Sequence, residues 1–425
     1  MFRFLHAADI HLDSPLVGLN RYEDAPTEIL RQASRHAFDR LIETAIEKEV
    51  AFVILAGDLF DGEWKDYNTG KFFVDRMQRL RARDIRVYSL RGNHDAESRL
   101  TKNLNTPDNV FKFKTGKGSS FGWPELKVTL HGCSYLEAAT TTNLVPKYGK
   151  AVEDHFNIGV LHTALGSENS GHANYAPCNL EDLKGKGYDY WALGHIHTRK
   201  VVSEDPWIVF PGNLQGRHAR ETGPKGATLV TVEDNKVTAV EALELDVLRW
   251  EVLNVDLRGI DSEEAMLDLV RSQLAKVVED AEDRPVAARL ILEGQTILHS
   301  DLLLETERLE LDLRSLASEV GDGTLWLEKI QIQTELSRDA KGEGSLAELA
   351  KIIKGRVVSD ESLKRRASEL ATLAKRLDKS GVRSEIDPTD FDHLRESYDE
   401  AKDFLEVLLT KESVGDDDLS EAAEE

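Results

Sequence analysis

Short apolar runs rich in Val, Ile, Phe and Tyr alternate with polar loops from the first residue to about Leu243, and longer segments of helical spacing lie between them. Such runs are typical of strands, and their mixture with helices indicates an α/β fold. The clearest unit is a strand at 2–8, a helix at 28–49 and a strand at 51–56. We expect further strands at 85–90, 127–133, 156–161, 188–193, 207–210, 227–232 and 237–243.

Beyond about residue 250 the pattern changes. It predicts a strand, a helix at 262–279, a strand at 287–292, a helix or turn, and a strand at 325–334, which together make a small α+β domain. A linker is expected at 340–344, followed by helical periodicity at 346–353, 360–377 and 388–409. The chain thus divides into a first domain at 1–245, a second at 246–340, a helical region at 345–412 and an acidic tail at 413–425 that we expect to be disordered.

The net charge of −23 is unfavourable for a protein that binds a polyanion, but it is distributed unevenly. The first 240 residues hold 30 of the 54 Lys and Arg and 31 of the 77 Asp and Glu, a net charge of −1. The remaining 24 basic and 46 acidic residues give the second half a net charge of −22. A near-neutral first half, with bound cations adding positive charge, presents no general barrier to a phosphate backbone.

We expect a cytoplasmic protein with no membrane partner. No run approaches the roughly 18 apolar residues of a membrane span, and the first residues lead into a strand pattern and not into a signal peptide. Cys133 and Cys178 lie far apart and form no Cys-x-x-Cys pair, so we expect both to be reduced and structural.

Five motifs in the first half each contain residues that can bind a divalent cation, and each follows an expected strand. Ligand sites in α/β sheets gather where strands end, so these motifs can meet along one edge. They are Asp9-Ile10-His11, Gly57-Asp58-Leu59-Phe60-Asp61, Gly92-Asn93-His94-Asp95, His162 in Gly-Val-Leu-His-Thr, and Gly194-His195-Ile196-His197. A single motif of this kind more often forms a turn or contains a histidine with a structural role. Five in order favour a shared metal site.

Two cations about 3.5–4 Å apart need a shared anionic ligand, and we assign that position to Asp58. One metal would take Asp9, His11, Asp58 and His197, and the other Asp58, Asn93, His162 and His195. His195 and His197, two apart on an extended segment, would point the same way. This mixture of carboxylate, imidazole and amide favours manganese, iron or zinc over calcium or magnesium.

His94 directly follows a ligand without being needed as one, so it is the candidate general acid for the leaving oxygen in an attack on phosphorus. Asp61 or Asp95 could orient its imidazole, and the sequence leaves that choice open. His172 and His218 lie in loops that could reach the site.

The five motifs resemble those of the calcineurin-like metallophosphoesterase superfamily. Their opening Ala8-Asp9-Ile10-His11-Leu12, and the later segment from Phe210 to His218, resemble bacterial DNA-repair exonucleases of the SbcD and YhaO type. The resemblance implies a four-layer fold of two packed β-sheets flanked by helices, the ligands given above, and manganese-dependent cleavage of DNA with His94 in the transition state. Arg217 and His218 become candidates for binding the substrate, as does Asp61, which stands where archaeal and eukaryotic relatives have histidine.

For the second half, the resemblance implies a capping domain that helps to select nucleic acid, and C-terminal helices that bind a coiled-coil ATPase of the structural-maintenance type. An apolar stripe in the last helix suits that partner, although it could equally cover the protein's own core (Phe391, Leu394, Tyr398, Ala401, Phe404, Leu405 and Leu408). Basic residues between Arg76 and Lys117 are candidates for phosphate contacts.

Two other functions stay open. The first is a phosphoesterase that acts on nucleotides or other small phosphoesters with the same metals. The second is a scaffold subunit with a vestigial site, which the retention of all seven ligands disfavours. The sequence leaves undecided the balance and polarity of exonuclease and endonuclease cleavage, DNA against RNA, the physiological metal, and whether the chain forms a homodimer.

Overall fold

The computed structural model describes residues 1–14, 27–61, 67–97, 104–166, 175–337 and 358–367, with single positions from 370 to 405. The chain forms two compact units, and the boundary lies between Trp250 and Glu251. The expected linker at 340–344, the acidic tail at 413–425, His172 and most of the expected C-terminal helices lie outside the described residues.

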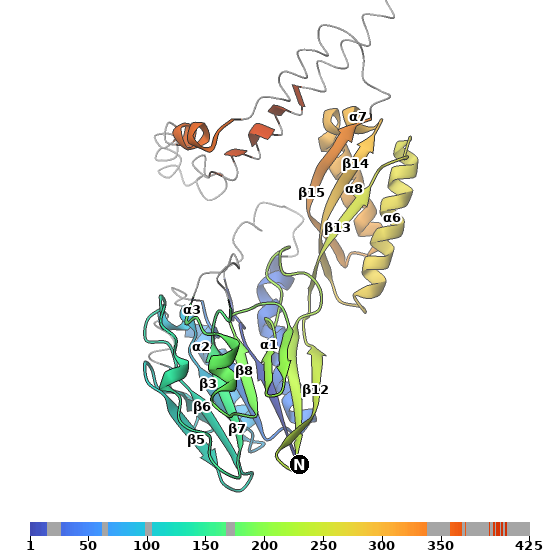
Figure 1. The fold of residues 1–425 in the computed structure, drawn as a ribbon. Helices are drawn as coiled ribbons and strands as arrows, with labels where there is room; N and C mark the ends of the chain where they lie inside the picture. The colour runs from blue at the N-terminus through green and yellow to red at the C-terminus, as the bar shows by residue number, and fades with distance from the viewer. Residues whose placement is uncertain are drawn as a thin grey trace, which may run out of the picture. The chain divides into compact units, whose positions relative to one another are not determined.

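The first unit contains a six-stranded sheet in the order β12-β11-β1-β2-β3-β4 (Figure 1). Its strands are β1 (Phe2–Ala7), β2 (Phe52–Ala56), β3 (Arg86–Leu90), β4 (Val110–Lys112), β11 (Gly226–Glu233) and β12 (Lys236–Glu244). Helices α1 (Thr27–Glu47) and α2 (Tyr67–Arg81) bury apolar side chains such as Leu41 and Phe73 against one face. These apolar side chains form the surface of each helix that packs on the sheet.

A second six-stranded sheet has the order β5-β6-β7-β8-β10-β9. Its strands are β5 (Ser119–Trp123), β6 (Val128–Gly132), β7 (Phe156–His162), β8 (Tyr190–Gly194), β9 (Lys200–Glu204) and β10 (Trp207–Phe210). Trp191 on its outer face is buried together with Val145 of the short helix η2 (Val145–Lys147) and Leu183 of α5 (Leu180–Lys184).

Aromatic and aliphatic side chains from both sheets fill the space between them. Phe4 stacks on Phe52 with ring centroids 5.0 Å apart, and meets Tyr190 of the other sheet edge to face at 5.3 Å. Val128 and Ile158 belong to the same buried cluster. The layers run helix, sheet, sheet, helix, which confirms the expected four-layer sandwich. Strands β1, β2 and β3 are parallel, as are β6, β7 and β8, so each set ends at one edge of its sheet.

The second unit has a three-stranded sheet in the order β13-β14-β15. Its elements are β13 (Arg249–Asp256), α6 (Glu263–Asp280), β14 (Val286–Thr296), α7 (His299–Leu304), α8 (Thr306–Val320) and β15 (Leu325–Leu336). Ser262 accepts a hydrogen bond from the Ala265 amide and caps α6. The segment expected to be a helix or a turn consists of two helices, and Val270, Leu290 and Leu313 lie in one core.

Three strands of the first unit were not expected from the sequence: β4, β5 and β9. All three are edge strands. An edge strand buries less of its surface, and all residues of Lys200–Glu204 are exposed or half-buried, without apolar alternation. Their weak apolar pattern is the physical reason that sequence periodicity overlooked them.

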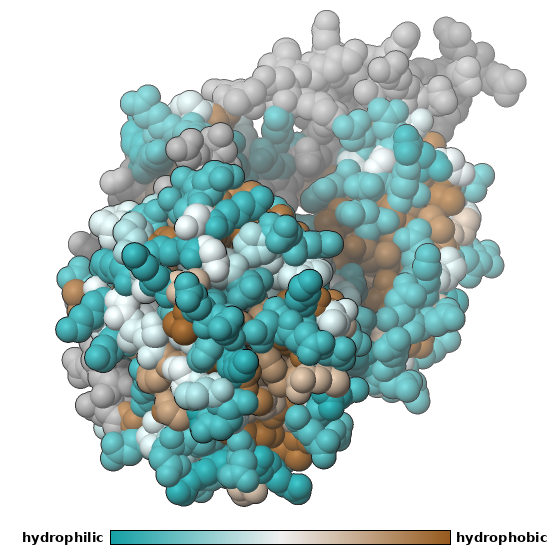
Figure 2. Space-filling model, turned by 60° about the horizontal axis from the view of Figure 1, so that its bottom comes forward, coloured by the Kyte–Doolittle hydropathy of each residue, from teal (hydrophilic) through white to brown (hydrophobic). Residues whose placement is uncertain are grey.

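The visible face of both units is largely hydrophilic, with separate patches of hydrophobic residues (Figure 2). Among the described residues, none of the helices combines the length and the apolar character that crossing a membrane requires.

Replacing Gly159 with alanine should lower the free energy of unfolding by about 1–3 kcal/mol, because the new methyl group overpacks the core. A Cβ at Gly159 would lie 2.3 Å from Cε3 of Trp191, which is fully buried. Urea unfolding followed by fluorescence measures the change. Gly122→Ala, on a strand of the same sheet, places its Cβ no closer than 3.9 Å to Thr129 and should change stability little. Equal midpoints for the two variants would contradict the packing argument.

Candidate metal centre

The five motifs meet where parallel strands of both sheets end. Asp9 follows β1, Asp58 follows β2, and Asn93 begins the short helix α3 (Asn93–Glu97) after β3. From the second sheet, His162 is the last residue of β7 and His195 follows β8. The structure therefore brings all five strand ends to one place, as expected from the sequence.

Asp9, His11 and His197 form one group whose ligand atoms lie within 4.8 Å of one another. His197 Nε2 is 3.9 Å from Asp9 Oδ1. His11 Nδ1 donates to Asp61 at 2.5 Å, and His11 Nε2 is buried without a hydrogen-bond partner. A buried imidazole nitrogen without a partner is costly, and a cation is the ligand that this donor set fits. Burial lowers the pKa of His11, which favours the neutral ring that binds metals.

His162 organises the second group. Its Nδ1 donates to the carbonyl of Ala56 at 3.0 Å, so Nε2 is the nitrogen that faces Asn93 Oδ1 at 3.0 Å and Asp58 Oδ2 at 3.2 Å. Burial alone would lower the pKa of His162, but the Asp58 carboxylate raises it to about 9. The position therefore attracts positive charge. The His195 ring lies 5.2 Å from the His162 ring between centroids.

The carboxylate common to two groups of ligand atoms is Asp9, which joins His11 and His197 in one and Asp58 and His162 in the other. Asp58, the shared ligand expected from the sequence, lies in the same group as Asp9, and its role as the bridge stays a prediction. Asp58 also accepts a hydrogen bond from the His94 amide at 3.0 Å. Both carboxylates are almost fully buried, and this arrangement can hold a pair of cations.

The backbone is strained where the ligands stand. Asp9, His11 and Asp58 have φ values of 50°, 46° and 51°, and His195 has a φ of 102°. Such conformations cost free energy in non-glycine residues and cluster at functional sites. The expected extended segment from His195 to His197 is wrong, because the positive φ of His195 turns the chain into bends directly after β8. The two rings consequently contact different partners, His162 and His11.

Glycines give the ligands room. Gly57 has a φ of 99°, and a Cβ there would lie 2.3 Å from His162 Nδ1. A Cβ at Gly92 would lie 2.3 Å from Asp58 Oδ1. The glycine that opens each of these two motifs is therefore required for the close approach of a neighbouring ligand.

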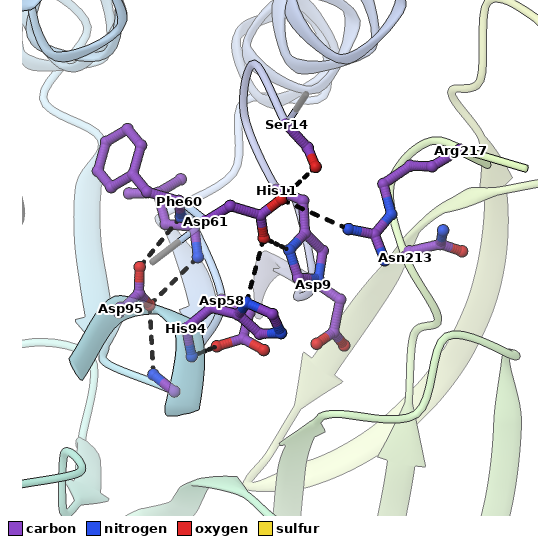
Figure 3. A network of polar contacts seen from close by, with 12 residues as sticks. Asp9, His11, Ser14, Asp58, Phe60, Asp61, His94, Asp95, Asn213 and Arg217 are labelled. Atoms are coloured by element: carbon purple, nitrogen blue, oxygen red, sulfur yellow. Dashed lines mark hydrogen bonds and ion pairs between the residues drawn. The ribbon is translucent and has the colours of Figure 1, made fainter. Parts of the chain in front are cut away.

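Asp61 lies between the metal-ligand candidates and the candidate acid (Figure 3). Its Oδ1 is 2.5 Å from His11 Nδ1 and 3.3 Å from His94 Nδ1, and its Oδ2 accepts from the Ser14 hydroxyl and lies 3.8 Å from Arg217 Nη1. Burial would raise the pKa of Asp61, but the hydrogen bond from His11 and the other contacts hold it well below its usual range.

Asp95, the alternative partner for His94, accepts instead from the amides of Leu59, Phe60 and Gly92. Burial, helped by the charge of Asp58, raises the pKa of Asp95 to about 6. Asp95 therefore holds two motif loops together, and the structure places Asp61 beside the His94 imidazole.

Sequence reasoning missed Glu221. Its Oε1 accepts from His197 Nδ1 at 2.6 Å and from Arg217 Nη2 at 3.3 Å, and its Oε2 accepts from the Arg217 amide at 2.8 Å and from Asn213 Nδ2 at 3.0 Å. Glu221 is buried, and burial would raise its pKa, but the hydrogen bond from His197 and the charge of Arg217 lower it. The only signal in the sequence was a carboxylate four residues after Arg217.

The candidate substrate contacts differ in placement. Arg217 is held at the site, whereas His218 is 54% exposed and its Nε2 lies 3.7 Å from Glu221. Other basic candidates are engaged elsewhere: Arg76 pairs with Asp39, Arg81 with Asp108, and Arg86 stacks on Trp123. Arg217 is therefore the cation among these that lies beside the metal ligands.

Two protein families match parts of this chain. Residues 2–199 match the calcineurin-like phosphoesterase family, and residues 250–335 match the family described as metallophosphoesterase YhaO, middle domain. An uncharacterized metallophosphoesterase, YhaO, from Bacillus subtilis (strain 168) is 33% identical over 79% of this chain and 82% of its own length.

A DNA double-strand break repair protein Mre11 from Sulfurisphaera tokodaii is 24% identical over 72% of this chain and 77% of its own length. A crystal structure of a dimetal phosphatase from Danio rerio shares 14% identity, covering 57% of this chain and 97% of that chain with a TM-score of 0.36. The chain belongs to the calcineurin-like metallophosphoesterase superfamily and, within it, to the YhaO/Mre11-type family.

Proposed function

We propose that this protein is a manganese-dependent DNA phosphodiesterase that works as a repair nuclease subunit. The observation that carries the proposal is the convergence of seven side chains with the ligand chemistry for two cations, including the partnerless Nε2 of His11. The similarity to Mre11 proteins, whose described role is DNA double-strand break repair, supports DNA as the substrate. The near-neutral charge of the first 240 residues is compatible with it.

Asp9, His11, Asp58 and His197 would hold one cation, and Asp58, Asn93, His162 and His195 the other. Bound cations supply positive charge to the phosphate oxygens and lower the pKa of water. Side chains of the protein would supply the proton for the leaving oxygen and a further positive charge. The His94 ring is 44% exposed, and its Nδ1 faces Asp61, which leaves Nε2 to protonate a leaving oxygen. Arg217 presents a fixed positive charge to phosphate.

The second unit supports assigning the DNA contacts to the first. Residues 251–337 hold 20 Asp and Glu against 8 Lys and Arg, an excess that repels a phosphate backbone. We therefore assign to this unit a role in excluding or guiding substrates, without broad contact to DNA.

We also propose that the C-terminal helices bind a coiled-coil ATPase. In the described part of that segment, residues 397–399, 401, 402, 404 and 405 are helical, and the side chains of Phe404 and Leu405 are 43% and 48% exposed. Exposed apolar side chains on one helix suit a helical partner.

Purified protein with manganese should degrade end-labelled DNA, and His94→Ala should slow the reaction by about 10²–10⁴-fold because the leaving oxygen loses its proton donor. His36→Ala, an exposed histidine on α1, is the matched control and should keep wild-type rates. Single-stranded, double-stranded and hairpin substrates are compared, with bis(p-nitrophenyl) phosphate alongside.

Hydrolysis of the small ester without degradation of DNA would contradict the DNA assignment and favour the small-phosphoester function. Failure to bind manganese at all would favour the scaffold function. A His94→Ala variant that degrades DNA at the wild-type rate would remove the acid role.

A further inference from the structure

Glu221 contacts both His197, a candidate metal ligand, and Arg217, a candidate contact for phosphate. One oxygen accepts from His197 Nδ1 at 2.6 Å, and the other accepts from the Arg217 amide at 2.8 Å. The side chain is 7% exposed, and both of its oxygens are used by donors. A buried carboxylate that receives this many hydrogen bonds is fixed in one orientation, and so are its donors.

The contact with His197 determines which ring nitrogen is available to a cation. A carboxylate can only accept, so His197 must carry its proton on Nδ1, and its Nε2 is then the lone-pair nitrogen on the side of Asp9. His11 has the same arrangement, with Asp61 as the acceptor of its Nδ1 proton. Outer carboxylates of this kind orient metal-ligating imidazoles.

The contacts with Arg217 fix the guanidinium from two sides. Arg217 Nη2 is 3.3 Å from Glu221 Oε1, and Nη1 is 3.8 Å from Asp61 Oδ2. The guanidinium therefore joins the two carboxylates that hold His197 and His11. Figure 3 shows Arg217 extended toward Asp61 and the adjoining ligands.

We propose that Glu221 is a positioning residue that sets the metal-binding tautomer of His197 and, through the same carboxylate, holds Arg217 where a substrate phosphate would lie. The proposal rests on the proposed two-metal function, which it deepens. The Glu221 carboxylate would thus determine both which nitrogen of His197 can bind a metal and where Arg217 lies.

Glu221→Gln tests the proposal because an amide, in either orientation, cannot accept all the hydrogen bonds that the carboxylate accepts. With its oxygen toward His197, its NH₂ group faces the donors of Arg217 and Asn213. With its NH₂ group toward His197, the ring must accept at Nδ1, and Nε2 then carries the proton and loses its lone pair. Glu221→Asp keeps the charge and is the conservative rescue. Glu244→Gln is the control, since Glu244 also pairs with an arginine, Arg249, outside the site.

The first measurement is calorimetric titration of the purified full chain with MnCl₂. We expect wild type and Glu244→Gln to bind two ions, and Glu221→Gln to bind one of them about 10–100-fold more weakly. Glu221→Asp should recover at least part of the affinity. Thermal unfolding without metal checks that each variant is folded. Wild-type affinity for both ions in Glu221→Gln, or an aspartate variant no better than the glutamine variant, would overturn the proposal.

The second measurement reads the tautomer directly. In metal-free protein, ¹⁵N chemical shifts should report His197 protonated on Nδ1 in wild type and a changed tautomer or a mixture in Glu221→Gln. An unchanged tautomer in a folded variant would overturn the proposal. Neither experiment uses DNA, so both still decide the role of Glu221 if the proposed DNA cleavage fails.

The link to Arg217 is tested by a double-mutant cycle on kcat/KM with bis(p-nitrophenyl) phosphate. If Glu221 acts partly by holding Arg217, then Arg217→Ala should reduce kcat/KM in wild type and have a much smaller effect in Glu221→Gln. Equal losses in both backgrounds would show that the two residues act independently, which contradicts the link.

Discussion

Replacing Asp58 with asparagine should abolish phosphodiester hydrolysis and lower the number of bound manganese ions from two to one at most. Asp58 is almost fully buried, and its Oδ2 lies 3.2 Å from His162 Nε2, in the same group as Asp9. The substitution keeps the shape and removes the negative charge that attracts a cation. Since each cation contributes several kcal/mol to catalysis, we expect a loss of at least about 10³-fold.

Manganese titration and hydrolysis are measured on the same preparations. A second readout is thermal unfolding, because a ligand that binds only the folded state raises its stability. Manganese should raise the melting temperature of wild type clearly more than that of Asp58→Asn. Asp75→Asn is the control, since Asp75 is an exposed carboxylate paired with Lys71 on α2. Two manganese ions bound with wild-type affinity in Asp58→Asn would contradict the assignment.

Replacing Gly57 with alanine should also greatly reduce the rate of phosphodiester hydrolysis, although glycine has no side chain that could take part in the reaction. Its φ of 99° disfavours any side chain, and the added Cβ would lie 2.3 Å from His162 Nδ1. Either His162 or the Asp58 loop must move, and a misplacement of about 1 Å costs roughly 10²-fold in rate. We also expect a loss of about 1–3 kcal/mol in the free energy of unfolding.

Gly187→Ala separates these causes. Gly187 has a φ of 69°, but no atom lies within 4 Å of the position that its Cβ would take. The control should therefore lose stability from backbone strain while keeping the rate of hydrolysis and the affinity for manganese. If Gly57→Ala retained full activity, the close approach of Gly57 and His162 would not matter to the site.

Sequence reasoning located the strand ends well, because parallel strands in a buried sheet carry continuous apolar runs. Asp9, Asp58 and His162 each follow or end such a run, and that regularity predicted a common edge. It failed where the local signal is weak: β9 lies at a sheet edge, and its residues, including the adjacent Val201 and Val202, are exposed or half-buried. It also failed for the bends after β8, since the positive φ of His195 leaves no mark in composition.

The groups around the ligands were harder to predict than the ligands themselves. Asp61 and Asp95 have the same chemistry and stand at similar places in their motifs. Only the folded chain shows that Asp95 accepts hydrogen bonds from backbone amides while Asp61 faces His94. Glu221 contacts His197 across 24 residues of sequence, and its loop has no periodicity. Long-range hydrogen bonds of this kind have no counterpart in a local pattern.

The ligands come from two different sheets: Asp9, Asp58 and Asn93 extend from one, and His162, His195 and His197 from the other. A pair of cations bound there would link the two sheets of the sandwich. Neither sheet supplies all of these ligands by itself. The two cations can therefore bind only after the two sheets have packed against each other. Loading with metal is thereby tied to completion of the fold, and a partly assembled chain would lack a complete phosphoesterase centre.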